Sequence, residues 1–301
     1  MARRRQSAKT IDFTKQDGAT RWFRNQPRSL SIAISARAAL RVFQTFPSES
    51  EFILPMLRAI HLAWSTGVHP ERAEELIACV DDVTGAFHAL GSFAESLADE
   101  SEAVAARVAY VAASATRVVN FEVGAAIATR LATRRIDVVA GNGAANIQYR
   151  ADASMFEAST TPQAILCTPL WSHHYPVEID AGWIQLTHDL LARHEEWEVW
   201  VNWCQDRING RSSLGAAFDI AVATLPNELW KQGPAAVNAR VKELIAEHTP
   251  PEPIPRPRRW PAVRSQSGYK DRSCAAGRTR CRREQSQAHR RAASAREASR
   301  Q

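Results

Sequence analysis

The stretch that decides the fold is EEWEVWVNWCQDRING, residues 195–210, and it is followed by PNELWKQGPAAVNARVKELI, residues 226–245. Six of the nine tryptophans of the chain lie in or near this stretch: Trp171, Trp183, Trp197, Trp200, Trp203 and Trp230. Because tryptophan has the bulkiest side chain, such a density predicts either a tightly specified local core or an exposed recognition surface.

Helical spacing places Trp197, Trp200 and Cys204 on one apolar stripe, with Trp203 at its edge. The stripe predicts a helix whose tryptophans belong to the core and which ends at Gly210. On its charged flank, Glu196 and Asp206 are expected to pair with the arginines Arg193 and Arg207. Farther along, Gly233 is predicted to end a short helix at Trp230, Pro234 to begin the next helix, and Asn238 to make a polar contact between packed ends.

Outward from this stretch, most of the chain has helical character. Residues 102–119, EAVAARVAYVAASATRVV, contain no glycine or proline and have high helix propensity. A helix over about 50–64 is predicted to stop at Gly67. We therefore predict an all-α protein, an irregular multi-helix bundle with disordered basic N- and C-terminal segments. Its predicted parts are a disordered basic arm (1–10), an alanine-rich helical region (11–158), a Trp-rich helical module (159–249) and a disordered basic tail (250–301).

Positive charge is concentrated at the two ends of the chain. Residues 252–301 hold 14 Lys and Arg against 4 Asp and Glu, whereas residues 11–251 hold 20 basic and 28 acidic residues. Residues 262–301 contain no Leu, Ile, Phe or Met, so this tail lacks the apolar side chains of a core. Three interpretations remain open: a solvated tail, a tail that makes weak non-specific contacts with nucleic acid, and an out-of-frame reading of a GC-rich gene.

Catalytic and metal-binding motifs are weak. IDVVAGNGAA, residues 136–145, could be read as a strand leading into a Gly-x-Gly dinucleotide turn, but Asn146 replaces the third glycine, and a turn between helices is favoured. His194 and Glu195 would open a zinc-binding HExxH motif, but Glu198 stands where its second histidine belongs. We predict no catalytic residue, no metal site and no cofactor.

The five cysteines are scattered and odd in number, which favours a reducing cytoplasm. The chain has no run of 18 apolar residues, and its basic N-terminus is not followed by the apolar segment of a secretory signal. A cytoplasmic location and no membrane association are therefore expected.

Four segments, LCTPLW (166–171), HEEWEVWVNWCQDRINGR (194–211), ATLPNELWKQGPAAVNARVKELI (223–245) and SARAALRVF (35–43), resemble a group of uncharacterised, alanine-rich helical proteins that are chiefly alphaproteobacterial. The resemblance covers roughly residues 22–248. The chain departs from the group at Cys204, where its members usually carry tyrosine, and in the tail. The resemblance implies that the Trp-rich block is a module of its own, but it implies no activity.

These observations favour a non-enzymatic cytoplasmic interaction or scaffold protein with an unknown protein partner. The region from Trp171 to Trp230 is the expected partner surface, through the tryptophans and through Arg207, Gly233, Pro234 and Asn238. The alternatives are a nucleic-acid-associated protein that binds through its basic ends and an enzyme of unrecognised class.

Overall fold

The computed structural model describes residues 11–79, 108, 121–141, 143–157, 161–171, 175–211 and 214–249. Within these ranges the chain forms helices and no strand, which confirms the all-α prediction. In order they are α1 (Gln16–Phe23), α2 (Arg28–Phe43), α3 (Ile53–Val68), the short 3₁₀ helix η2 (Pro70–Arg72), α6 (Phe121–Ala140), α7 (Ala144–Glu157), α8 (Pro162–Leu166), α9 (Val177–Leu191), α10 (Glu198–Ile208), α11 (Ala216–Ala223), α12 (Asn227–Trp230) and α13 (Pro234–His248). The basic arm and the basic tail lie outside the described residues.

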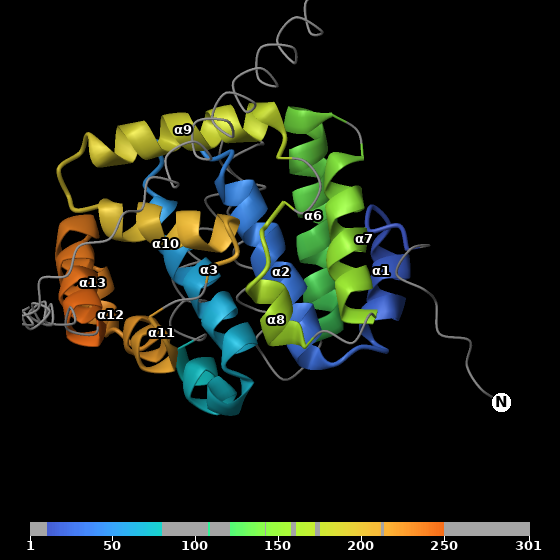
Figure 1. Cartoon of the computed structure of the whole chain (residues 1–301), viewed down its shortest axis with the longest axis horizontal. Coiled ribbons are helices and arrows are strands. Elements are labelled where there is room, and N and C mark those ends of the chain that lie inside the picture. Colours follow the sequence, from blue (N-terminus) through green and yellow to red (C-terminus); the bar gives the residue numbers. More distant parts are fainter. Residues whose placement is uncertain are drawn as a thin grey trace, which may run out of the picture. The chain divides into compact units, whose positions relative to one another are not determined.

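Helix α2 is the centre of the packing. It lies between α3 and α6 and is in contact with both (Figure 1). Fourteen of its sixteen residues are buried, so no face of this helix is left to solvent. Leu30, Ile34, Leu40 and Phe43 supply its large apolar side chains. The rest of the helix is also buried, because its serines and alanines are small enough to let the neighbouring helices approach.

The alanine-rich region and the Trp-rich module share one core. Buried side chains from α1 to α7 and from α8 to α13 belong to the same apolar cluster. The described residues accordingly lie in one compact unit, which ends at Pro250. The two halves are in direct contact at several places: α8 packs on both α2 and α3, α11 packs on α3, and α9 packs on α6.

Gly67 does not end its helix, contrary to the prediction, since α3 continues to Val68. A Cβ atom at this position would come within 2.7 Å of Leu166 Cδ1. Glycine thus lets α8 approach α3 closely here, because a larger residue would force the Leu166 side chain to shift.

The segment 136–145 is not a strand. Helix α6 runs through it to Ala140, and Gly141 and Gly143 adopt positive φ angles of 87° and 90° before α7 begins at Ala144. Asp137 Oδ1 accepts a hydrogen bond of 3.1 Å from Gly143 N. The favoured interpretation, a turn between two helices, is confirmed.

Candidate functional site

The tryptophans of the Trp-rich module belong to the core. Only 2 % of Trp197 and 2 % of Trp200 is exposed, as the apolar stripe predicted. Trp171, Trp183 and Trp203 are also buried, and Trp230 is half-buried. Packing therefore covers five of the six indoles and leaves Trp230 half-buried, and a partner surface in this region stays a prediction.

Asn238 of α13 forms hydrogen bonds with α10 and with the turn that precedes it. Its Oδ1 accepts a hydrogen bond of 2.8 Å from Trp200 Nε1, and its Nδ2 donates one of 2.8 Å to Glu195 O. The predicted polar contact is therefore present. Gly233, with φ 90° and ψ −176°, precedes α13, and Pro234 occupies the first turn of that helix, as predicted.

The charged flank of α10 pairs differently from the prediction. Glu196 accepts from Lys242 of α13 at 2.6 Å, and Asp206 accepts from Arg211 Nε at 2.6 Å. Arg193 donates to the backbone carbonyl of Ser48. The reason is geometric: Arg207 points inward and is 2 % exposed, so it is out of reach of the surface carboxylates.

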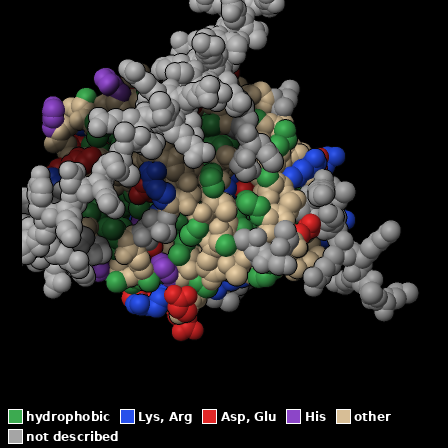
Figure 2. Space-filling model, in the orientation of Figure 1, with side chains coloured by type: hydrophobic (Ala, Val, Ile, Leu, Met, Phe, Trp, Pro, Cys, Tyr) green, Lys and Arg blue, Asp and Glu red, His purple; other side chains and the backbone are tan. Residues whose placement is uncertain are grey.

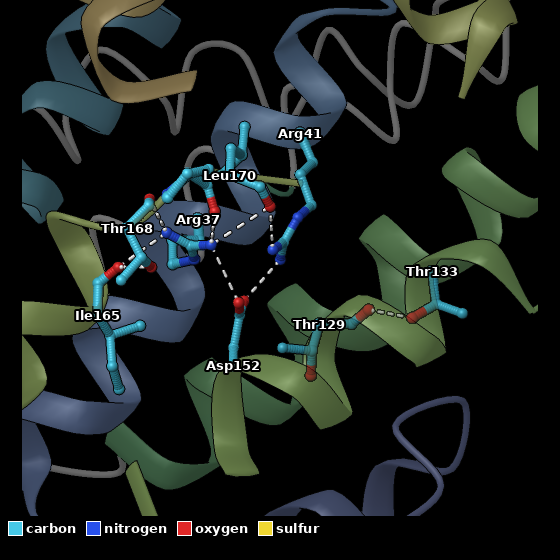
Figure 3. Close-up of polar contacts among 9 residues, drawn as sticks. Arg37, Arg41, Thr129, Thr133, Asp152, Ile165, Thr168 and Leu170 are labelled. Atoms are coloured by element: carbon cyan, nitrogen blue, oxygen red, sulfur yellow. Dashed lines mark hydrogen bonds and ion pairs between the residues drawn. The ribbon is translucent and has the colours of Figure 1, made fainter. Parts of the chain in front are cut away.

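A buried ionic triad, which sequence reasoning did not find, lies at the centre of the unit. Arg37 and Arg41 of α2 meet Asp152 of α7, and all three side chains are fully buried (Figure 3). Arg37 Nη2 lies 3.0 Å from Asp152 Oδ1, and Arg41 Nη1 lies 2.8 Å from Oδ2. Burial opposes ionisation of the carboxyl, but the two guanidinium groups outweigh it and lower the pKa of Asp152 below its usual value.

Two cations and one anion leave a surplus of positive charge in the core, and backbone oxygens of 165–170 compensate for it. Arg37 and Arg41 donate hydrogen bonds of 2.6–2.9 Å to the carbonyl oxygens of Ile165, Thr168, Pro169 and Leu170 (Figure 3). The amide of Leu170 in turn donates to Ile208 O at 2.9 Å. Gly210 lies against the same segment, since a Cβ there would be 2.5 Å from Pro169 N. The triad thus holds residues 165–170 in place, and this segment in turn packs against the C-terminal end of α10.

Three of the four large apolar side chains that are exposed in the described part of the Trp-rich module lie on α9, and the fourth, Leu214, precedes α11. The inner face of α9 carries the buried side chains Ile179, Trp183, Leu186 and Leu190. On its outer face Val177, Ile184 and Leu191 are 68 %, 62 % and 45 % exposed. We call the outer residues Val177, Ala181, Ile184, His188 and Leu191 the α9 stripe, which is apolar except for His188. At about 100° per residue they lie roughly 150° around the helix from the inner face.

An open cleft runs beside α9. It is bounded by the 45–49 segment, α6 and α9, and its volume is about 460 Å³. Glu49, Glu178 and Asp189 line it together with Arg135. Hydrogen bonds from Gln185, Ser48 and His188 lower the pKa of Asp189, which keeps this carboxylate ionised. Arg135 is held by Thr45, whose backbone oxygen accepts from Nη2 at 2.9 Å. The cleft therefore has an excess of negative charge.

The face drawn in Figure 2 shows no continuous basic field of the kind that nucleic-acid binding requires. The visible Lys and Arg side chains lie in scattered groups among Asp and Glu. The basic ends on which that alternative depends lie outside the described residues. It stays a prediction from the sequence.

In the ranges that the structure describes, no group of three or more His, Cys, Asp and Glu side chains could hold a metal ion. Likewise, no helix of the described chain is both long enough and apolar enough to cross a bilayer. Comparison with known proteins yields no matching family, no matching curated protein and no matching solved structure. The candidate site therefore depends on the geometry of this chain alone.

Proposed function

We propose that this protein is a non-enzymatic, cytoplasmic interaction protein, and that the α9 stripe binds an amphipathic helix of a partner protein whose flanks are basic. The observation that carries the proposal is the exposed apolar outer face of α9, opposite a second apolar face that already packs on the core. A helix that is apolar on two opposite faces is expected to be buried on both.

The spacing of the stripe fits a helical partner. Positions 177, 181, 184, 188 and 191 alternate steps of four and three residues, which is the a/d spacing of a coiled-coil seam. The fifteen residues of α9 provide two such heptads. Val177, Ile184 and Leu191 fall at equivalent positions, where their side chains would insert between residues of a facing helix.

The charges that flank the stripe favour a basic partner over a second copy of this chain. Glu178 and Asp180 flank its N-terminal half, and the acidic cleft lies along one side. In a parallel pair of two α9 helices these carboxylates would face each other and repel. Lysine or arginine at the flanking positions of the partner would complement them.

The proposal is tested by titrating the full chain into two labelled peptides and measuring fluorescence anisotropy. Both peptides are helices of about three heptads with leucine at the a and d positions. One has lysine and the other has glutamate at the flanking positions. We expect the lysine peptide to bind and the glutamate peptide to bind much more weakly.

Glu178→Lys should reduce the affinity for the lysine peptide and raise the affinity for the glutamate peptide, while Glu228→Lys, at an exposed position of α12, should change neither. Equal binding of the two peptides would contradict the charge argument. Self-association of the chain that the lysine peptide displaces would identify a second copy as the occupant and overturn the proposal.

A further inference from the structure

A second cavity lies in the Trp-rich module, and the proposed interaction does not involve it. Its volume is about 200 Å³, and four separate elements meet around it. Trp64 and His69 come from α3 and its C-terminal end, Cys167 follows α8, Arg207 lies on α10 and Asp219 lies on α11. We call this cavity the Arg207 pocket.

The walls of the Arg207 pocket are held by interactions already described. The ionic triad fixes the 165–170 segment, which carries Cys167, and Gly67 allows α8 to pack directly on α3. A pocket whose walls are positioned by the core keeps its shape without a ligand, so binding would cost little ordering of the protein.

Arg207 is the main charged group of the pocket. Its guanidinium carbon lies 5.1 Å from the ring centroid of Trp203 and 6.0 Å from that of Trp64, and Nη1 donates a hydrogen bond of 2.8 Å to Arg211 O. Its Nε is buried without a hydrogen-bond partner. The two carboxylates whose charge acts on this guanidinium, Asp219 and Asp206, are in direct contact with His69 and Arg211 instead. A buried arginine with a neutral backbone acceptor alone is electrostatically incomplete.

The one buried carboxylate of the pocket is engaged elsewhere. Asp219 Oδ2 lies 2.9 Å from His69 Nε2, and Oδ1 lies 3.9 Å from His61 Nε2. Burial lowers the pKa of His61 to about 4, so this ring is neutral near pH 7. Asp219 therefore contacts His69 directly, and it attracts Arg207 only from beyond ion-pairing distance.

We propose that the Arg207 pocket binds a small organic carboxylate, whose carboxylate group pairs with Arg207 and whose apolar part lies against Trp64. Arginine matches the planar geometry of a carboxylate, and a singly charged anion is repelled less by Asp219 than a phosphate dianion would be. Val68 and Leu166 extend the apolar wall. The space corresponds to roughly six or seven water molecules, which suits an acid with a short aliphatic chain or a single ring.

Isothermal titration calorimetry of the full chain with butyrate and benzoate tests the proposal, with benzamide as the uncharged counterpart of benzoate and inorganic phosphate as the doubly charged anion. We expect at least one of the two carboxylates to bind, and benzamide and phosphate not to compete with it. Arg207→Met removes the charge and keeps an unbranched apolar side chain. It should weaken carboxylate binding by roughly 10- to 100-fold, the effect of losing a hydrogen bond to a charged group.

Because Arg207 is buried, the variant could fail to fold, so a second measurement uses the folded wild-type chain. Cys167 is exposed and lines the pocket. Alkylation with N-ethylmaleimide should place an adduct at the pocket and abolish carboxylate binding. Cys167→Ala should bind the carboxylate before and after the same treatment, which controls for the other cysteines. Carboxylate binding that survives alkylation of wild-type Cys167, or equal binding of benzamide and benzoate, would overturn the proposal.

Discussion

The indole Nε1 of Trp200 donates a hydrogen bond of 2.8 Å to Oδ1 of Asn238, and this contact joins α10 to α13 within the interior. The rings of Trp203 and Trp230 lie 6.2 Å and 6.3 Å from that of Trp200, centroid to centroid. Trp200 is thus both an apolar anchor and a hydrogen-bond donor. Its partner, Asn238, also holds the turn that precedes α10 through Glu195 O.

Removing either member of this pair should destabilise the fold. Trp200→Ala should lower the free energy of unfolding by about 3–5 kcal/mol, because it leaves a large cavity. Asn238→Ala should lower it by about 1–3 kcal/mol, because the indole N–H loses its buried acceptor. Urea unfolding of both variants and of the double variant measures the coupling. Strict additivity of the two losses would contradict a direct interaction.

The ionic triad should be sensitive to loss of its carboxylate. Asp152→Ala leaves two buried guanidinium groups without a counter-ion, and we expect a loss of about 3–5 kcal/mol in unfolding free energy. Glu228→Ala, at an exposed position, should change it by less than about 0.5 kcal/mol. Because the folded-state pKa of Asp152 is lowered, its contribution is present above the unfolded pKa and is lost as the pH falls through the folded value. Equal unfolding free energies of Asp152→Ala and Glu228→Ala, measured by urea unfolding, would show that the triad does not stabilise the fold.

His61 should make the stability depend on pH in a separate window. Burial lowers its pKa from 6.5 to about 4, so below pH 6.5 the unfolded chain binds a proton that the folded chain does not. Stability should therefore fall between about pH 6.5 and pH 4, by at most about 3 kcal/mol from this group. Urea unfolding at pH 7 and pH 4.5 should show a smaller decrease for His61→Gln than for the wild type. An unchanged decrease would mean that His61 titrates normally.

The sequence predicted features that depend on local periodicity or on backbone conformation. Helical spacing identified Trp197 and Trp200 as core residues, and glycine and proline marked the start of α13 correctly. Local periodicity does not predict the triad, because Asp152, the partner of Arg37 and Arg41, lies more than a hundred residues away along the chain. One signal was present: residues 29–43 include no charged side chain other than these two arginines, so a helix with no polar face had to bury them.

Tryptophan density in a sequence fits a recognition surface as well as a core, and packing buries five of the six indoles of this region. The expectation of a partner surface between Trp171 and Trp230 stays a prediction. The α9 stripe could have been found from the sequence, because residues 177–191 carry apolar side chains on two opposite faces. Its significance depends on knowing which face packs inward, and only the tertiary structure supplies that.

The most direct test of the central claim, that α9 presents a helix-binding surface, is the affinity of Ile184→Glu for the lysine-flanked peptide. The matched control is Ile147→Glu on α7, whose wild-type side chain is 55 % exposed compared with 62 % for Ile184. We expect Ile184→Glu to abolish peptide binding and to keep the wild-type melting temperature, and Ile147→Glu to change neither. If Ile184→Glu binds the peptide as tightly as the wild type does, or if it lowers the melting temperature sharply because another part of the chain covers Ile184, the claim is wrong.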